Sequence, residues 1–223
     1  MLHKILVVTA TLTEAGSLVR LEGLQTVPAG GNAEIIPLVA GVGSIATAWE
    51  LQKWISVNEK PDLAINCGIA GSYNEKIKIG DVVLPVADCF ADAGVEDGND
   101  FLTLSEAGLT DANMFPFTDG HILAQNEYVE RLKERVMPVR AITVNTATGS
   151  DATREKLIEK FNPDIETMEG AAFFYICSRA KIPFLSLRAI SNMVETRNRH
   201  NWDIPLALKN LSETLNDVVL KLK

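Results

Sequence analysis

Two carboxylates and one amide follow predicted buried strands, and all three are side chains that can act on a bound ligand. Glu14 comes after the first strand, Glu169 closes a short strand, and Asn192 stands where the last core strand turns polar. A carboxylate can take up a proton or accept hydrogen bonds from two neighbouring hydroxyls, whereas an amide both donates and accepts. Each residue also has a purely structural interpretation, because glutamate favours the first turn of a helix and asparagine often turns the chain as a strand ends.

The stretch RAISNMVETRNRHNW at 188–202 adds cationic and aromatic side chains to the amide. Arg188 lies in an otherwise buried strand, where a guanidinium needs partners, so a structural ion pair and a role in a ligand site are both open. Arg197, Arg199 and Trp202 follow shortly afterwards. Arginine can hold a carboxylate through two hydrogen bonds, and an indole can cover an aromatic ring. Both arginines could equally be solvated loop residues that pair with nearby acids.

These residues must be positioned by strands that alternate with helices. The hydrophobic patterns predict strands at 4–9, 33–40, 63–67, 81–86, 140–145, 165–169 and 184–191, and helices at 45–56, 126–136, 151–161, 170–180 and from about 204 to 222. Such alternation predicts an α/β fold, a three-layer α/β/α sandwich with a central mixed sheet. Ligands of open α/β sheets collect beyond the carboxyl ends of the strands, which is where the candidate residues fall.

Two further segments bear on a site. The run GIAGS at 68–72 follows the third strand, and the small residues Ala70 and Gly71 would let a ligand approach the backbone. Residues 91–120 are rich in Asp, Gly and Asn and form the one long, weakly patterned insertion. Such an insertion is a candidate for a mobile or interface-forming loop.

The composition fits one domain that spans 1–223. With 223 residues, of which 47% are hydrophobic, the chain can bury one sizeable core. A net charge of −8 argues against a nucleic-acid or anionic-membrane surface, and no apolar run approaches the length of a membrane span. Cys67, Cys89 and Cys177 show neither disulfide nor metal-ligand spacing, and the first strand leaves no room for a signal peptide. Reduced thiols in a cytoplasmic protein are therefore expected.

Five motifs in one order resemble the purine nucleoside phosphorylase and nucleosidase superfamily. They are GVG at 41–43 before a helix, NCGIAGS at 66–72, IGDVVLP at 79–85, IETMEGAA at 165–172 and LRAISN at 187–192. The resemblance covers nearly the whole chain. It implies a nucleoside phosphorylase-like fold, a small-molecule nucleoside as substrate, no cofactor or metal ion, and a homo-oligomer of at least two chains.

The resemblance also implies roles for individual residues. Glu14 matches the acid that activates the attacking water in the nucleosidases, and a carboxylate there can also stabilise an oxocarbenium-like charge. Glu169 matches the glutamate that binds the ribose diol. Met168 would lie against the ribose face, with ordinary core filling as the alternative, and Arg188 would order the polar network on the sugar side.

Asn192 departs from the pattern of the superfamily. Adenosine-type nucleosidases carry an aspartate at the matching position, which can donate a proton to purine N7 and accept from a 6-amino group. An amide can instead donate to N7 or O6, so Asn192 favours a 6-oxopurine such as hypoxanthine. Ser191, beside it, is also expected to contact the substrate.

Missing arginines favour water over phosphate as the nucleophile. Phosphorylases of this architecture use arginines to hold phosphate. One of these arginines falls where this chain has Gly80, and no arginine occurs between Met1 and Val19, where another would fall. Ser72 and Thr148 could bind an anion, but hydroxyl groups alone hold phosphate poorly.

The sequence VETRNRHNWDIPLALKNL at 194–211 looks most like the futalosine hydrolases of the alternative menaquinone pathway. The expected function is hydrolysis of futalosine to hypoxanthine and dehypoxanthine futalosine, with Arg197 or Arg199 holding the substrate carboxylate and Trp202 covering its aryl group. The alternatives are a methylthioadenosine/S-adenosylhomocysteine nucleosidase, a purine nucleoside phosphorylase and a non-catalytic nucleoside sensor. Asn192 weighs against the first and Gly80 against the second, whereas the presence of both glutamates weighs against the third.

Overall fold

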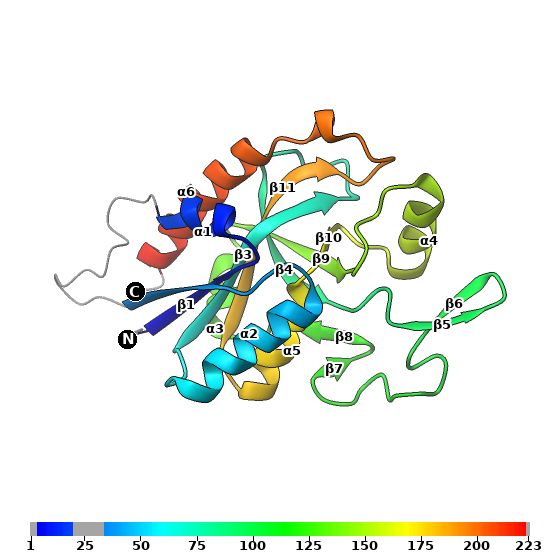
Figure 1. Cartoon of the computed structure of the whole chain (residues 1–223), viewed down its shortest axis with the longest axis horizontal. Coiled ribbons are helices and arrows are strands. Elements are labelled where there is room, and N and C mark those ends of the chain that lie inside the picture. Colours follow the sequence, from blue (N-terminus) through cyan, green and yellow to red (C-terminus); the bar gives the residue numbers. More distant parts are fainter. Residues whose placement is uncertain (1–3, 20–33, 222–223) are drawn as a thin grey trace.

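The structure is a computed structural model that describes residues 4–19 and 34–221 (Figure 1). Its strands are β1 (Lys4–Thr9), β2 (Glu34–Val39), β3 (Leu63–Ser72), β4 (Val82–Asp88), β5 (Gly94–Asp97), β6 (Asp100–Thr103), β7 (Phe117–Thr118), β8 (His121–Leu123), β9 (Met137–Thr143), β10 (Ile165–Thr167) and β11 (Phe184–Met193). Its helices are α1 (Leu12–Val19), α2 (Ser44–Val57), α3 (Glu127–Leu132), α4 (Asp151–Phe161), α5 (Gly170–Ala180) and α6 (Ile204–Lys221), with a short 3-10 helix η1 (Arg199–Asn201). Within these ranges, no helix combines the length and the apolar character that crossing a membrane requires.

Five of the strands close into a ring. β3 pairs with β11, β11 with β4, β4 with β9, β9 with β10, and β10 pairs back onto β3. The pairs β11–β4 and β10–β3 are antiparallel and the other three are parallel. β1 and β2 extend the sheet from β3, whereas β8 and β7 extend it from β4. The predicted α/β class with a mixed central sheet is confirmed, and the closure of the ring is a feature that the hydrophobic pattern does not indicate.

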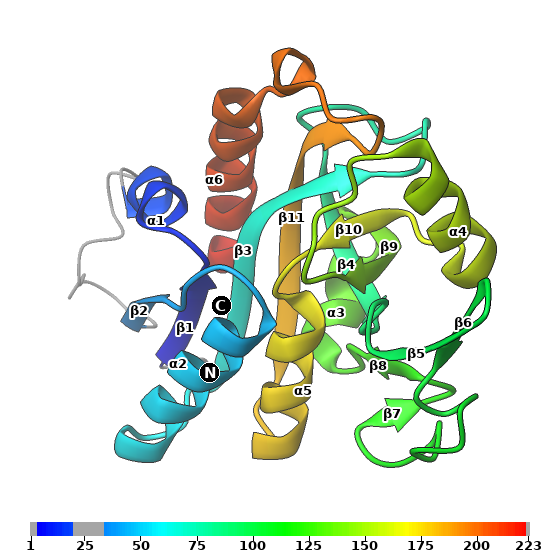
Figure 2. The same cartoon turned by 45° about the vertical axis from the view of Figure 1, so that its right-hand side comes forward.

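Helices cover the sheet on both sides. α6 packs on α1 and on β3, β4 and β11, while α5 packs on α2 and lies against β8 and β9. Both views place α1 and α6 on one side of β1 and β3, and α2 and α5 on the other (Figures 1 and 2). The strands between them must therefore be apolar on both faces. β11 is buried from Phe184 to Ser191, and α5, as its sequence predicts, is buried over most of its surface.

A β-bulge near the end of β11 changes the direction of its side chains. The pairing of β11 with β3 is regular up to Ile190, which stands opposite Ala70, and then shifts so that Asn192 stands opposite Gly71. Ser191 is therefore the extra residue of the bulge. Because side chains alternate between the two faces of a strand, the bulge turns Asn192 from the face of Ile190 to the opposite face.

The elements differ from the sequence patterns in a few places. β3 continues to Ser72, because its last residues still pair with β10 and β11, so the run GIAGS is strand rather than loop. α3 is shorter than the predicted helix at 126–136, since the chain leaves it to enter β9 at Met137. The insertion at 91–120 contains the hairpin β5–β6 and the short strand β7.

Candidate active site

A cleft of about 200 Å³ opens where the predicted site residues converge. Eight of these residues line it: Ala70, Gly71, Glu14, Met168, Glu169, Ser191, Asn192 and Trp202. They come from α1, β3, the β10–α5 junction, β11 and the segment after η1. Arg188, Arg197 and Arg199 lie outside the lining. Chain segments far apart in the sequence thus meet at one cleft, as the strand-end reasoning predicts.

Glu14 is buried at the start of α1, and its two carboxylate oxygens have different neighbours. Oε2 accepts hydrogen bonds from the Ala10 N–H at 3.1 Å, the Thr11 N–H at 2.8 Å and the Thr11 hydroxyl at 3.0 Å. Thr11 Oγ1 in turn accepts from the Glu14 N–H at 3.2 Å, so the two residues form a capping box. Oε1 accepts from the Ile69 N–H of β3 at 3.3 Å. The helix-start interpretation of Glu14 is therefore correct for Oε2, while the same side chain lines the cleft.

Glu169 and Arg188 form a buried ion pair. Arg188 Nη1 lies 3.4 Å from Glu169 Oε2, and the Gly43 N–H donates to Glu169 Oε1 at 3.1 Å. Arg188 is only 1% exposed. Since Glu169 lines the cleft and Arg188 does not, the guanidinium holds the carboxylate from behind. The ion-pair interpretation of Arg188 is correct, and its part in ordering the sugar side stays a prediction.

The guanidinium of Arg188 also contacts two residues of β3, of which Ile69 lines the cleft. Nη2 donates to Asn66 Oδ1, and Nη1 donates to the Ile69 carbonyl at 3.5 Å. A side chain at Gly68 would collide with Nη1 and would lie 3.0 Å from Glu14 Oε1. Gly68 therefore leaves open the space in which Arg188 approaches both glutamates.

Ser191 fixes the orientation of the Asn192 amide. The Ser191 hydroxyl donates to Asn192 Oδ1 at 2.8 Å, and Asn192 Nδ2 donates to the Met193 carbonyl at 2.9 Å. Nδ2 faces β3, because a Cβ added to Gly71 would lie 3.3 Å from it. Nδ2 carries two hydrogens, so the bond to Met193 leaves one N–H for a ligand.

Glu166 is a third carboxylate in the cleft lining, and the sequence interpretation missed it. It is buried on β10, where Oε2 accepts from the Tyr73 hydroxyl at 2.7 Å and Oε1 from the Thr148 N–H at 2.9 Å. Burial, followed by the charge of Glu166, raises the pKa of Tyr73, so the phenol remains a donor. The available signal was a charged residue within a short buried strand, which needs partners just as Arg188 does.

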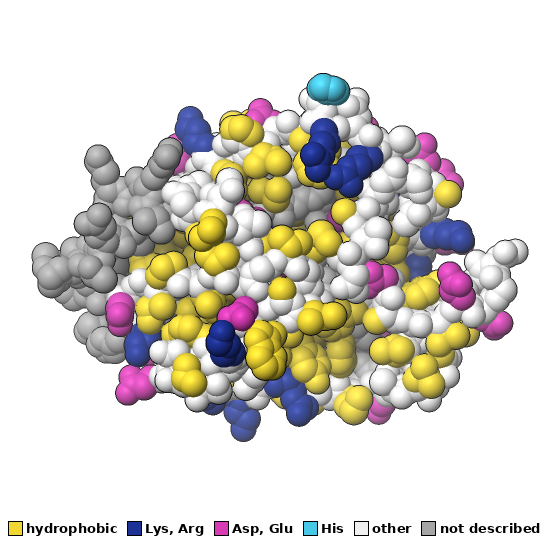
Figure 3. Space-filling model, viewed as in Figure 1, with side chains coloured by type: hydrophobic (Ala, Val, Ile, Leu, Met, Phe, Trp, Pro, Cys, Tyr) yellow, Lys and Arg dark blue, Asp and Glu magenta, His cyan; other side chains and the backbone are white. Residues whose placement is uncertain are grey.

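Of the two loop arginines, Arg197 contacts segments that line the cleft. Its Cζ lies 5.9 Å from the ring centroid of Trp202, and its N–H donates to the Gly149 carbonyl at 3.3 Å, next to Thr148. Arg199 is exposed on η1, and neither arginine forms an ion pair with any residue that the structure describes. Figure 3 shows basic side chains gathered at the top of this face, near the loop between β11 and α6.

Asp88 is a buried acid near the ion pair. Oδ1 accepts from the Thr143 hydroxyl at 2.9 Å, whereas Oδ2 has no hydrogen-bond partner among the described residues and lies against Gly170 at the start of α5. Burial raises the pKa of Asp88 to about 7, while the Thr143 hydrogen bond and the charge of Arg188 act in the opposite direction. Asp88 does not line the cleft, so it can influence the site only through its neighbours.

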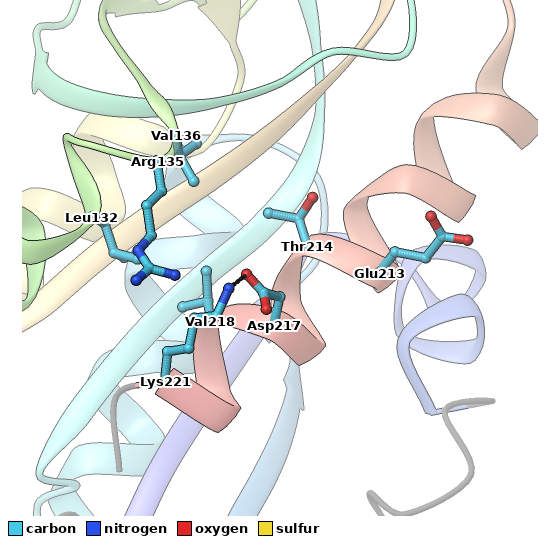
Figure 4. Close-up of a pocket in the computed structure, with 8 residues that line it drawn as sticks. All are labelled: Leu132, Arg135, Val136, Glu213, Thr214, Asp217, Val218 and Lys221. Atoms are coloured by element: carbon cyan, nitrogen blue, oxygen red, sulfur yellow. Dashed lines mark hydrogen bonds and ion pairs between the residues drawn. The ribbon is translucent and has the colours of Figure 1, made fainter.

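Two other hollows in the surface bring together none of the predicted site residues. One of about 310 Å³ lies between the end of α3 and α6, where Lys221 pairs with Asp217 on α6 and Arg135 approaches from the other side (Figure 4). The other, of about 360 Å³, lies between the insertion and the end of α4, and there Lys160 pairs with Glu106 at 2.6 Å. Each hollow thus contains an ion pair, and none of the predicted site residues lines either of them.

The charged side chains that line the cleft are all acidic. They are Glu14, Glu166 and Glu169, and none of the described residues in the lining is Lys, Arg or His. Ser72, considered above for anion binding, lies outside the lining and donates to the Asn74 carbonyl at 3.0 Å. In 4–19 and 34–221 no group of three or more His, Cys, Asp or Glu could hold a metal ion. An acidic cleft repels anions and stabilises positive charge that develops on a ligand.

Known proteins are similar to this chain in sequence and in fold. Residues 5–222 match the sequence model of the phosphorylase superfamily. The futalosine hydrolase of Acidothermus cellulolyticus is 34% identical over 217 residues, which cover 93% of this chain and 87% of that protein. The 5′-methylthioadenosine/S-adenosylhomocysteine nucleosidase of Buchnera aphidicola subsp. Schizaphis graminum is 26% identical over 200 residues, which cover 85% of this chain and 80% of that protein.

The fold has a close counterpart among solved structures. The structure of the futalosine hydrolase of Helicobacter pylori matches with a TM-score of 0.81 and 19% identity, over 99% of each chain. At this identity the match concerns the arrangement of the elements alone. It therefore extends the predicted nucleoside phosphorylase-like fold to the whole described chain.

Proposed function

This chain belongs to the futalosine hydrolase family of the phosphorylase superfamily, and from that membership we propose that it hydrolyses the N-glycosidic bond of futalosine. The products are hypoxanthine and dehypoxanthine futalosine. Three tasks follow from this reaction: activation of a water molecule, fixation of the ribose, and recognition of the departing base. A fourth is recognition of the carboxylate at the other end of futalosine.

Glu14 activates the water. Its Oε2 is occupied by the capping box, whereas Oε1 has one weak internal donor, the Ile69 N–H at 3.3 Å. Oε1 can therefore take the proton of a water molecule in the cleft. The same negative charge stabilises the oxocarbenium-like sugar as the bond breaks.

Glu169 binds the ribose diol. Arg188 and the Gly43 N–H hold its two oxygens in place, and each oxygen retains capacity for a hydroxyl donor. Met168 precedes Glu169 in the lining and packs against the sugar. A sugar held by a fixed carboxylate needs little further ordering before it reacts.

Asn192 binds the base. The bulge at Ser191 turns the amide toward the cleft, and the Ser191 hydroxyl fixes it by donating to Oδ1. Nδ2 gives one of its two hydrogens to the Met193 carbonyl, which leaves the other for the ligand. That donor suits N7 or O6 of hypoxanthine. An amide cannot protonate N7 as an acid can, so this interpretation disfavours methylthioadenosine/S-adenosylhomocysteine nucleosidase activity.

The acidic lining of the cleft is the observation that best supports hydrolysis over phosphorolysis. Three glutamates line it, and a phosphate nucleophile would need cations that this lining lacks among its described residues. Gly80, at the position of a phosphate-binding arginine, has φ +93°, and a Cβ there would lie 2.9 Å from Leu206 Cδ2. Water, which is uncharged, is the nucleophile that this acidic lining can accept.

Arg197 holds the carboxylate of futalosine. It lies over Trp202, which lines the cleft, and its backbone is bonded to the segment that carries Thr148. Trp202 can cover the aryl group that bears this carboxylate. Arg199 is the weaker candidate because it contacts Trp202 only through its backbone carbonyl, which accepts from the Trp202 N–H at 3.3 Å, while its side chain is exposed.

Turnover assays test the function directly. The purified protein is incubated with futalosine, inosine and methylthioadenosine, each with and without phosphate, and the released bases are separated by chromatography. Hypoxanthine should be released from futalosine at a rate that phosphate leaves unchanged. Formation of ribose 1-phosphate derivatives would make the protein a phosphorylase, preferential adenine release would make it an adenosine-type nucleosidase, and binding without turnover would make it a sensor.

We also propose that the enzyme is a homodimer and that it works in the cytoplasm. Ile45 and Trp49 on α2 are 85% and 67% exposed, and Val42, which lines the cleft, is 56% exposed. Figure 3 shows hydrophobic side chains over α2. This stripe supports a homodimer in which a second copy covers α2 beside the cleft.

Three buried, free cysteines support a cytoplasmic location, where the reaction would serve menaquinone biosynthesis.

A further inference from the structure

We propose that Glu166 selects the base by accepting a hydrogen bond from N1–H of a 6-oxopurine, and thereby rejects 6-aminopurines. The inference rests on the proposed function, because it names the group that chooses the base which that reaction releases. None of the roles described above uses Glu166, although it is a buried carboxylate in the cleft lining. It is therefore the one acidic residue of the cleft without a task.

The glycines of β3 distinguish the two ends of the cleft. A Cβ at Gly68 would meet Arg188 and Glu14, the residues assigned to the sugar side. A Cβ at Gly71 would instead lie 3.3 Å from Asn192 Nδ2 and 3.7 Å from Glu166 Cγ. Gly68 and Gly71 lie three residue steps apart on one strand, which corresponds to about 10 Å.

Glu166 and Asn192 therefore lie together at the base end. β10 pairs with β3 so that Glu166 stands opposite Gly71, and β11 pairs with β3 so that Asn192 also stands opposite Gly71. The two strands approach β3 from its two sides. A flat ring lying over Gly71 would have the amide on one side and the carboxylate on the other.

The pair matches the edge of hypoxanthine and mismatches that of adenine. Hypoxanthine presents O6 as an acceptor next to N1–H as a donor, which suits the Asn192 N–H and the Glu166 carboxylate. Adenine presents an amino donor next to N1 as an acceptor, so both contacts would be reversed. A site built around hydrogen bonds strongly rejects a ligand that leaves its buried polar groups unpaired.

The internal partners of Glu166 fix its role as an acceptor. Tyr73 and Thr148 each donate one hydrogen bond to it, at 2.7 Å from the hydroxyl and 2.9 Å from the N–H. An ionised carboxylate offers about four acceptor sites, so capacity remains for a ligand donor. Both internal partners also restrain the side chain, which reduces the entropy lost on binding.

Glu166→Gln tests the proposal. Gln can still accept from the Thr148 N–H through its oxygen, and it can donate to the Tyr73 hydroxyl, so the local contacts persist. The other hydrogen of its amide would then face N1 and favour adenine. The ratio of kcat/KM for futalosine to that for its 6-amino analogue should fall by roughly 10- to 100-fold, which corresponds to losing one hydrogen bond to a charged group.

Tyr73→Phe is the matched control, because it removes one internal partner and keeps the carboxylate. In Tyr73→Phe, the ratio of kcat/KM for futalosine to that for the 6-amino analogue should stay within about threefold of the parental ratio, whatever happens to the absolute rates. If Glu166→Gln lowered kcat/KM equally for futalosine and its 6-amino analogue, the ratio would be unchanged. Glu166 would then only hold the Thr148 segment in place and would not select the base. An inactive parent would instead refute the proposed function, so the two failures are distinguishable.

A ligand-side measurement keeps the test valid even if Glu166→Gln fails to fold. Calorimetry on the parent compares hypoxanthine with 1-methylhypoxanthine, which keeps the 6-oxo group and has a methyl group in place of the N1 hydrogen. Hypoxanthine should bind roughly tenfold or more tightly. Equal dissociation constants for the two bases would overturn the proposal.

Discussion

Glu14 combines a structural contact and a proposed catalytic one in a single side chain. Its Oε2 completes a capping box with Thr11, a motif that glutamine forms as well as glutamate. Glu14→Gln should therefore keep α1 and the melting temperature while removing the base. Turnover of futalosine should fall by about 10²- to 10⁴-fold, the usual contribution of a general base, as measured by steady-state kinetics.

The matched control for Glu14 is Glu127→Gln. Glu127 is also an acid in the first turn of a helix, but it is exposed on α3 and away from the cleft. Its variant should show the parental rate and melting temperature. A Glu14→Gln enzyme with near-parental turnover would remove Glu14 from the mechanism.

Arg197 and Arg199 provide a test of the distal end of the substrate. Arg197→Ala should lower kcat/KM on futalosine by roughly 10-fold or more, because a hydrogen-bonded ion pair is lost, and should leave inosine almost unaffected. Arg199→Ala is the control from the same loop and should change neither substrate appreciably. If Arg197→Ala weakened both substrates equally, its contact with Trp202 would be supporting the loop rather than binding a carboxylate.

The raised pKa of Asp88 predicts that the stability of the fold depends on pH. Burial raises its pKa from 3.8 to about 7, so between these values the folded chain keeps a proton that the unfolded chain has lost. Stability from this group is thus complete at low pH and decreases as pH rises through that window, by roughly 1 kcal/mol per pH unit. Arg188 and Glu169 are the charged groups nearby, with Arg188 opposing the shift.

Asp88→Asn should remove this dependence, since it has no proton to lose. Urea denaturation at pH 5 and pH 8 should show that the variant gains stability relative to the parent at the higher pH. The Thr143 hydroxyl can still donate to Oδ1 of the asparagine, so the comparison tests the proton rather than the hydrogen bond. A difference between the two proteins that is the same at both pH values would contradict the assignment.

At the level of the elements, the turn at Gly43 links the start of α2 to the ribose site. Gly43 has φ +91°, which disfavours any side chain, and its N–H donates to Glu169 Oε1 at 3.1 Å. Gly43→Ala should shift this N–H and reduce kcat/KM on ribosides by about tenfold, with a loss of stability of about 1–3 kcal/mol. Gly98→Ala, at φ +64° in the β5–β6 turn with open space around it, should lose stability but keep the parental activity. If both variants kept parental activity, the Gly43 contact would have no part in catalysis.

The elements that the sequence predicted well have local signals at their ends. α4 spans Asp151–Phe161 as expected, with the Ser150 hydroxyl oxygen accepting from the Thr153 N–H and Asn162 in the left-handed conformation at the other end. The strand ring and the bulge at Ser191 could not be predicted in the same way, because both depend on pairing between distant strands. The position of Glu166 beside Asn192 could not be predicted for the same reason, since it exists only once β10 and β11 both pair with β3.

For the whole molecule, the exposed stripe on α2 predicts assembly. Ile45→Lys combined with Trp49→Lys should convert a dimer into a monomer in analytical ultracentrifugation, because two charges would have to be buried in the interface. Leu220→Lys, at another exposed apolar position (65%) on α6, is the control and should leave the mass unchanged. A parent that sediments as a monomer at micromolar concentration would refute the dimer.

The ring of strands also determines when the edges of β3 become paired during synthesis of the chain. β3 needs β11 on one side, and β11 is synthesised more than 100 residues after β3, so that side of β3 stays unpaired until β11 emerges. β1 and β2 can pair with β3 early, since they precede it. An unpaired, apolar strand edge is a template for association with other chains. The interval before Phe184–Met193 emerges is therefore when the open edge of β3 is most exposed to such association.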